Sequence, residues 1–280
     1  MANTQLILVE GLPGAGKSTT AKLTNDILKE NNISTQLFLE GNLDHPADYD
    51  TVSYFSAEEF TGLIEQYADY RNLLMKYTEA NNEGYILPRY KLRKELGELA
   101  LPEALQKQLW EHDIYELQLE KNMELITEKW QRFCDQAMNG EDTYIFECCF
   151  IQNPVTIGMV KYGASDELVT GYVNRLTEII EPLNPILLYV EQKDLRKSFE
   201  KAVQERPKEW STGFIDYYNN QGYGKKHGAE GIEGTLAVLE ARSQLESQIF
   251  DSLNMKKFKV DNSTFNFNEH KKRLIEKLKM

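Results

Sequence analysis

The chain has 280 residues, which is enough for one large domain or for a core domain that carries a substantial insertion. Its composition, 41% hydrophobic and 27% charged, is typical of a soluble globular protein, and no apolar run approaches the roughly 20 residues that a membrane span needs. The net charge of −12 argues against a protein that binds nucleic acid through a basic surface. The first residues lack the basic start and the cleavage site of a signal peptide, so we expect a cytoplasmic protein without membrane or nucleic-acid partners.

Short apolar runs alternate with segments of helical periodicity along most of the chain. This alternation predicts βαβ units, which build parallel sheets with helices on both faces. The first unit joins a strand at 5–9 and a helix at 17–30 to a strand at 35–39. Further strands are predicted at 143–149, 185–190 and 257–260, and further helices at 166–180, 194–205, 235–253 and 268–279. The sequence therefore predicts an α/β fold with a five-stranded parallel sheet.

Residues 57–138 carry no strand pattern. Helical periodicity is present around 57–80 and 103–137, and the polar residues 81–84 separate these two stretches. No linker isolates this segment from the chain on either side of it. We therefore expect a large helical insertion within a single domain that spans residues 1–280.

Residues 11–18, GLPGAGKS, match the pattern G-x-x-x-x-G-K-[ST], which is the Walker A motif or P-loop. Glycines allow successive backbone N–H groups to turn toward phosphate oxygens, and the helix that follows adds its free amides. We expect Lys17 to reach the β- and γ-phosphates of a nucleotide and the hydroxyl of Ser18 to bind Mg²⁺. The expected nucleotide-binding residues are Gly11, Pro13, Gly14, Ala15, Gly16, Lys17, Ser18 and Thr19.

The segment GLPGAGKST and the βαβ unit around it resemble the P-loop kinases of small molecules, which include nucleoside monophosphate kinases, thymidylate kinase, deoxynucleoside kinases and chloramphenicol phosphotransferase. The resemblance is specific over residues 4–40, depends on element order over 143–262, and does not extend to 57–138. It implies a three-layer P-loop NTPase fold with strand order 2-3-1-4-5, and ATP and Mg²⁺ as cofactors. It also implies a nucleotide contact for Asn262, because these kinases hold the adenine with the loop after the last strand.

The resemblance also implies that the insertion covers the acceptor side of the sheet. An insertion of this size indicates an acceptor larger than a nucleotide, or an interface through which the protein forms an oligomer.

Two acidic residues compete for the role of general base. Glu147 lies near the carboxyl end of the third predicted strand, where the ligands of parallel sheets gather. Deoxynucleoside kinases carry a base-like glutamate at a similar strand end, although Glu147 would also suit Mg²⁺ as a Walker B acid does. Asp44 follows the second strand, where chloramphenicol phosphotransferase-like kinases carry their base and nucleotide kinases bind the acceptor. His45 beside it is a further candidate contact for the acceptor.

Several basic residues are candidates for charge neutralisation or for acceptor binding. Arg206 follows the predicted helix at 194–205, a position that lid arginines of the resembling kinases often take. The Gly- and Lys-rich residues 221–234 are predicted to form a mobile loop. Arg89 and Arg93 share a face if their segment is helical, and they either bind an anionic acceptor or pair with nearby acids.

These features predict an ATP-dependent kinase that transfers the γ-phosphoryl group to a hydroxyl or phosphate of a small molecule, such as a nucleoside, a nucleotide or an antibiotic-like compound. The alternative is an NTP-hydrolysing switch or regulatory ATPase that uses the insertion to bind a partner. Strands of hydrolase machinery often end in Asp-Asp or Asp-Glu, whereas the strand at 143–149 has the single acid Glu147, followed by cysteines. The sequence also lacks the Asn-Lys-x-Asp motif by which switch GTPases read their base. Both observations favour the kinase.

Overall fold

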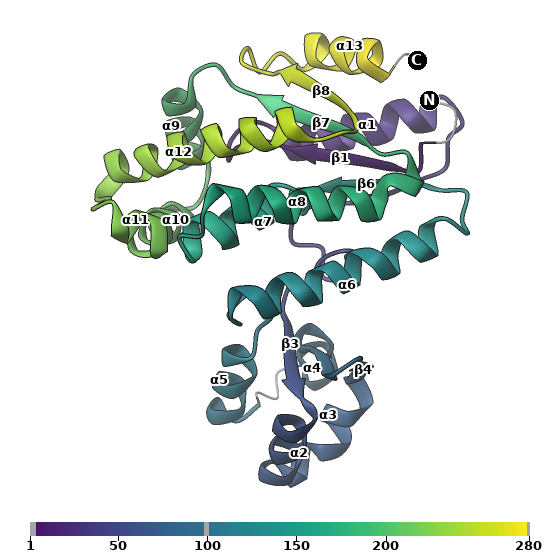
Figure 1. Ribbon diagram of the computed structural model, residues 1–280, viewed down its shortest axis with the longest axis vertical. Helices are drawn as coiled ribbons and strands as arrows, with labels where there is room; N and C mark the ends of the chain where they lie inside the picture. The colour runs from purple at the N-terminus through teal and green to yellow at the C-terminus, as the bar shows by residue number, and fades with distance from the viewer. Residues whose placement is uncertain (1–3, 98–100, 279–280) are drawn as a thin grey trace. The chain divides into compact units, whose positions relative to one another are not determined.

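The computed structural model describes residues 4–97 and 101–278, and the chain forms two compact units (Figure 1). The first unit contains the chain up to Glu40 and again from Lys129, and the second is formed by Gly41–Glu128. The second unit therefore begins and ends earlier than the insertion that was predicted at 57–138.

The first unit is built on a parallel sheet of five strands, as predicted. The strands are β1 (Leu6–Glu10), β2 (Thr35–Phe38), β6 (Thr143–Glu147), β7 (Ile186–Glu191) and β8 (Lys256–Asp261). Their order across the sheet is β2-β6-β1-β7-β8. The predicted order 2-3-1-4-5 numbered only the five strands of this sheet. The observed labels differ from it because three strands of the second unit, β3, β4 and β5, lie between β2 and β6 in the chain.

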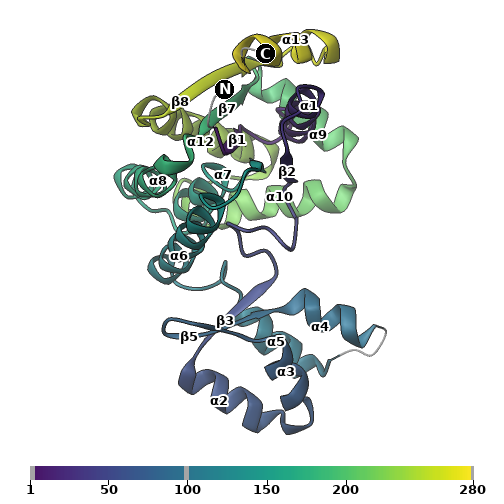
Figure 2. The same cartoon turned by 90° about the vertical axis from the view of Figure 1, so that its right-hand side faces the viewer.

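Helices cover both faces of this sheet (Figure 2). Successive residues of a strand point to opposite faces, so Ile7 and Val9 meet the apolar sides of α1 and α13, whereas Tyr189 of β7 contacts Phe250 of α12 on the other face. The helices of this unit are α1 (Lys17–Glu30), α7 (Gln152–Val155), α8 (Asp166–Ile180), α9 (Leu195–Glu205), α10 (Lys208–Asn220), α11 (Gly222–Lys226), α12 (Gly231–Ser252) and α13 (Phe267–Leu278). A π-helical turn at Thr156–Lys161 and a 3-10 turn at Glu181–Leu183 complete it, and α6 (Leu119–Ala137) belongs to both units.

The prediction of a mobile loop at 221–234 is wrong for most of this segment, because Gly222–Lys226 forms α11 and α12 begins at Gly231, with only a short connection between the two helices. Its glycines permit close packing of backbones. A Cβ atom added to Gly224 would lie 2.0 Å from the carbonyl oxygen of Tyr218, and one added to Gly222 would lie 2.6 Å from that of Lys161. The glycine-rich composition therefore reflects contact between helices in this region.

The second unit has a separate core and a three-stranded antiparallel sheet in the order β3-β5-β4. Its elements are β3 (Val52–Ser56), α2 (Ala57–Gln66), a 3-10 turn (Ala68–Tyr70), α3 (Arg71–Tyr77), β4 (Glu79–Asn81), β5 (Gly84–Pro88), α4 (Arg89–Leu96) and α5 (Glu103–Glu111). The prediction that 57–138 contains no strand is therefore wrong. β4 is short and polar, and β5 is bounded by Gly84 and Pro88, so neither carries a periodic signal and the pairing between them supplies their stability.

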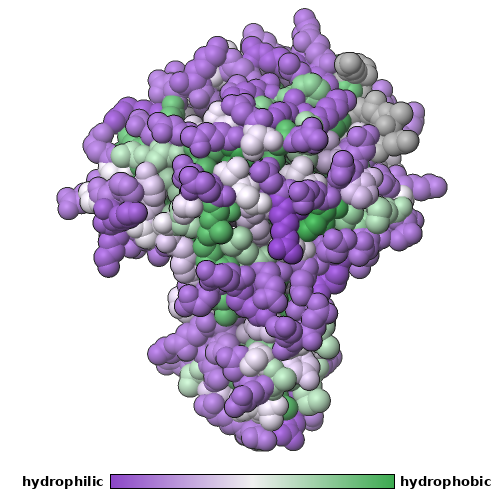
Figure 3. Space-filling model, viewed as in Figure 1, coloured by the Kyte–Doolittle hydropathy of each residue, from purple (hydrophilic) through white to green (hydrophobic). Residues whose placement is uncertain are grey.

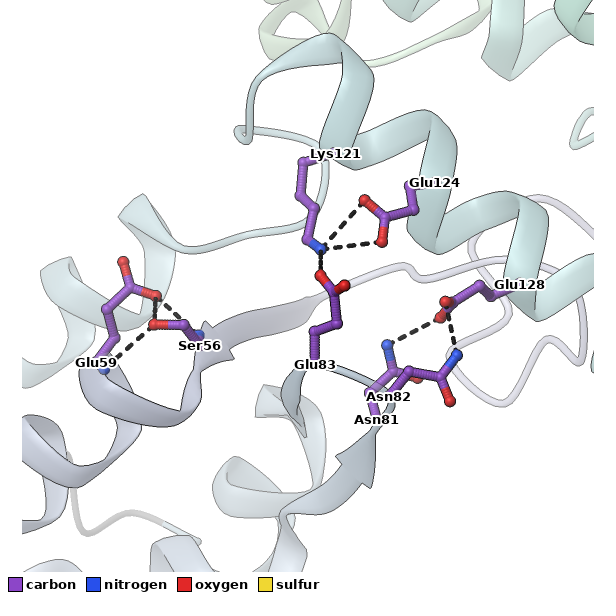
Figure 4. Close-up of polar contacts among 8 residues, drawn as sticks. All are labelled: Ser56, Glu59, Asn81, Asn82, Glu83, Lys121, Glu124 and Glu128. Carbon is purple, nitrogen blue, oxygen red and sulfur yellow. Dashed lines mark hydrogen bonds and ion pairs between the residues drawn. The ribbon is translucent and has the colours of Figure 1, made fainter.

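Side chains of the second unit fix two of its turns (Figure 4). Ser56 begins α2 and forms a capping box with Glu59, whose backbone N–H donates to the Ser56 hydroxyl over 3.3 Å. The turn between β4 and β5 is held by the first part of α6. Asn81 and Asn82 donate to Glu128 over 3.0 and 2.8 Å, and Lys121 bonds Glu83 and Glu124 over 3.2 and 3.1 Å.

Hydrophilic side chains cover most of the face shown in Figure 3, with apolar side chains exposed between them. Among the helices that the structure describes, none combines the length and the apolar character needed to cross a membrane.

Candidate functional site

The glycine-rich loop connects β1 to α1 and is held from outside by two amide side chains. Asn262 donates from Nδ2 to the carbonyl oxygen of Ala15 over 2.9 Å, and Gln192 donates to the same oxygen over 3.1 Å. Gly16 has a φ of +95°, and a Cβ atom there would lie 2.5 Å from Asn262 Nδ2. Only glycine meets both conditions, and Asn262, which was predicted to contact the adenine, supports the loop directly.

Helix α1 begins at Lys17, directly after the loop. The N–H groups of a first helical turn have no carbonyl partner within the helix, and this turn contains no acidic residue. The Lys17 side chain is 6% exposed and donates from Nζ to the carbonyl oxygen of Leu12 over 3.1 Å. Free amides and a buried ammonium group therefore face the same loop, which is the donor set that an oligophosphate requires.

Two carboxylates meet at the carboxyl end of β6. Glu147 is 3% exposed, and its Oε1 accepts from the Ser18 hydroxyl over 2.6 Å. Its Oε2 accepts from the backbone N–H of Glu40 over 3.2 Å. The Glu40 carboxylate is exposed and accepts from the Gln152 side-chain amide over 2.8 Å. These contacts place a serine hydroxyl, a buried carboxylate and an exposed carboxylate in one cluster.

Ligand atoms of this cluster lie close enough together to hold a metal ion. One ligand atom each of Glu40, Glu147 and Cys148 lies within 4.8 Å of the others. Burial raises the pKa of the Cys148 thiol well above its ordinary value, and soft sulfur is not a ligand that Mg²⁺ prefers. The hydroxyl of Ser18 and the carboxylate oxygens remain, and oxygen ligands are those that Mg²⁺ prefers.

The turn after β6 holds an unusual backbone conformation. Cys148 has a φ of +71°, which is rare for a residue with a side chain, and its N–H donates to the carbonyl oxygen of Val9 over 3.2 Å. The following N–H groups of Phe150 and Gln152 donate to the Glu10 carboxyl group over 2.8 and 2.9 Å. Glu10 therefore fixes the turn that carries Gln152 toward Glu40.

The Glu10 carboxyl group should make stability depend on pH. Burial raises its pKa from 4.5 to about 7, against the opposing effect of the backbone N–H groups. Between these values the folded chain keeps a proton that the unfolded chain releases, so the free energy of unfolding falls as pH rises from about 5 to about 8, by roughly 2–3 kcal/mol. Urea denaturation of wild type and Glu10→Gln across this range measures the effect. A wild-type-minus-variant difference that does not change with pH would contradict it.

A first cavity of about 280 Å³ opens over the glycine-rich loop. Eight residues predicted from the sequence are brought together in its lining: Gly14, Gly16, Lys17, Ser18, Thr19, Glu147, Arg206 and Asn262. The lining residues that the sequence analysis did not assign to the site include Glu40, Lys201, Glu205, Phe265 and His270.

A second cavity of about 430 Å³ adjoins the first, and the two share Lys17, Glu40 and Arg206 in their linings. One wall is the aromatic side of α10, which carries Trp210, Phe214, Tyr217 and Tyr218. The spacing of these rings is a helical signal that was available in the sequence and was not used. The guanidinium carbon of Arg206 lies 4.2 Å from the centre of the Trp210 ring, and Arg206 lines both cavities.

No protein-family model matches the chain, and no curated protein matches its sequence significantly.

Asp44 and His45, the candidate acceptor contacts after β2, belong to the second unit. Asp44 is exposed and accepts a hydrogen bond from the Tyr90 hydroxyl. His45 is buried, and its Nδ1 accepts from the backbone N–H of Ala47 over 3.1 Å. Glu40, which precedes both residues in the chain, is the acid after β2 that joins the cluster with Glu147.

Arg89 and Arg93 are one turn apart on α4, within the second unit. The Arg89 guanidinium pairs with Asp113 and donates to the Ser53 hydroxyl over 2.9 Å. Of the two roles that the sequence left open for Arg89, the structure therefore shows the pairing with a nearby acid. Arg93 is exposed and lines a cavity of about 230 Å³ together with Arg89.

Proposed function

We propose that the protein is a phosphotransferase that uses ATP and Mg²⁺ to phosphorylate a small molecule. The observation that carries this proposal is the pair of adjoining cavities that share Lys17, Glu40 and Arg206. Phosphoryl transfer needs a donor site and an acceptor site on either side of one phosphate, with cations at the point of transfer. A hydrolase needs room only for water there, so the second cavity favours transfer.

The residues of the first cavity suit a magnesium-bound nucleotide. The left-handed Gly16, the free amides at the start of α1 and the buried Lys17 form a cradle for phosphate oxygens, and Ser18 with Glu147 supplies oxygen ligands for the metal. When bound, ATP supplies the activated γ-phosphoryl group and Mg²⁺ neutralises its charge.

Glu40 is the residue that we propose as general base, in place of Glu147 or Asp44. Its carboxylate lines both cavities, whereas Glu147 lines only the first and already accepts from Ser18 and from the Glu40 amide. The Gln152 amide orients the Glu40 carboxylate. An acceptor hydroxyl in the second cavity would give its proton to Glu40, while Arg206 and Lys17 would stabilise the charge on the transferring group.

The test is incubation with ATP labelled at the γ-phosphate, Mg²⁺ and a panel of nucleosides, nucleotides, sugars and antibiotic alcohols. We expect label to appear in one class of acceptor, and the Lys17→Ala variant to give none. Release of all label as inorganic phosphate, at a rate that no acceptor changes, would overturn the proposal in favour of an NTP-hydrolysing switch.

A further inference from the structure

A third cavity lies within the second unit, where residues of α4 and α5 line it together (Figure 1). Its volume is about 230 Å³. None of its described lining residues lines either cavity at the glycine-rich loop. A ligand in this third cavity would therefore not contact the residues of the proposed phosphoryl transfer.

Much of the lining of this third cavity is apolar. Leu109 belongs to the core of the second unit, and Leu96 packs against that core. Trp110, the next residue of α5, also lines the cavity, although it is 57% exposed. An exposed indole beside apolar surface in a concave site indicates that a ligand can cover it, because burying that surface releases free energy.

The two arginines of the lining differ in their charge balance. Arg89 pairs with Asp113 and donates to the Ser53 hydroxyl, so its charge is already neutralised. Arg93, one turn along α4, is exposed, and its side chain forms no ion pair or hydrogen bond with the described residues. The cavity is therefore lined by one guanidinium group that is accessible and lacks a counter-ion among these residues.

The charges around this cavity favour a ligand with a single negative charge. The sequence of α4, RYKLRKEL, is basic, whereas the chain as a whole has a net charge of −12. The described lining residues include no carboxylate. A local positive group attracts one anionic group, but an anion with several charges is repelled by the acidic remainder of the chain. The planar fork of a guanidinium group also matches the geometry of a carboxylate.

From these observations we infer that the third cavity binds a small monocarboxylate with an apolar body. Arg93 holds the carboxylate group, and Leu96, Leu109 and Trp110 pack against the apolar body. The cavity is smaller than the roughly 300–1,000 Å³ of sites that take drug-sized ligands, so the apolar body is a single ring or a short chain. The inference concerns a separate site and does not depend on the proposed function.

NMR titration tests the ligand class, because the chain has three tryptophans and the variant Trp110→Phe assigns one of their three indole N–H signals. The probes are 3-phenylpropionate and hexanoate, the uncharged amide of each, and acetate. We expect at least one of the two larger carboxylates to shift the Trp110 signal to saturation and to bind about three- to tenfold more tightly than its amide, since the amide cannot form the ion pair with the exposed Arg93. Acetate should not reach saturation, because it lacks the apolar body.

Three results would overturn the inference. The first is the absence of a saturable shift of the Trp110 signal with either larger carboxylate at millimolar concentration. The second is equal affinity within both pairs of carboxylate and amide. The third is a Trp110 signal that moves when the protein alone is diluted, which would assign the cavity to a contact between copies of the chain.

The variant Arg93→Gln tests the protein side of the same contact. It should bind the carboxylate about three- to tenfold more weakly than wild type and bind the amide with unchanged affinity. Lys94→Gln is the matched control, because it removes an equal charge from an exposed position of the same helix that does not line the cavity. If the two variants bind the carboxylate equally well, Arg93 does not hold it and the inference is wrong.

Discussion

Lys17→Ala should weaken the binding of ATP·Mg²⁺ by at least about 100-fold. The Lys17 ammonium is buried under the glycine-rich loop, where hydrogen bonds to the phosphate oxygens of a nucleotide would be charge-assisted and shielded from water. Two such bonds at about 1.5–3 kcal/mol each account for a loss of this size. Calorimetry with a non-hydrolysable ATP analogue measures it.

The control for this variant is Lys22→Ala, which removes an exposed lysine from the same helix. It should bind the analogue as the wild type does. Affinity retained by Lys17→Ala within a few-fold of wild type would contradict nucleotide binding at the loop.

Glu40→Gln should lower kcat by about 10²–10⁴ and leave the KM for ATP nearly unchanged, because the substitution removes a proton acceptor and keeps the shape of the side chain. Glu147→Gln should instead raise the Mg²⁺ concentration needed for half-maximal rate, since this carboxylate holds the Ser18 hydroxyl. Steady-state rates measured against ATP, acceptor and Mg²⁺ separate the two effects.

Two further variants make this comparison decisive. Glu30→Gln, at the exposed end of α1, should leave all three parameters unchanged. The variant Asp44→Asn tests Asp44, which the sequence favoured as the general base after β2. If Asp44→Asn lowers kcat and Glu40→Gln does not, the role that we propose for Glu40 is wrong.

Local patterns allowed much of the first unit to be predicted from the sequence. The apolar run of β1, the glycine-rich loop and the start of α1 are consecutive in the chain, so their relation is fixed by a few residues. The pairing of Ser18 with Glu147 was within reach for another reason. Parallel strands bring their carboxyl ends to one edge, and β1 and β6 are neighbours in the sheet.

Other parts of the site depend on contacts between residues that are distant in the sequence, and no hydrophobic periodicity predicts such contacts. Gln152 reaches Glu40 only because Glu10 fixes the turn after β6 and Cys148 adopts a left-handed conformation. Arg242, which lines the second cavity, lies in a long helix whose sequence shows weak amphipathicity, so nothing marks it as buried. The glycines at 222 and 224 lie in a segment whose composition is typical of a loop. The contacts that accompany their helical conformation come from neighbouring segments.

Glu40 is the last residue of the first unit, and Gly41 begins the second. The backbone N–H of Glu40 donates to the Glu147 carboxylate, and the carbonyl carbon of Glu40 is bonded to the first residue of the second unit. A ligand or protein that pulls on the second unit would therefore act on the hydrogen bond between Glu40 and Glu147 through one peptide link. Under the proposed function, a force on this junction would therefore move the carboxylate that we propose as general base.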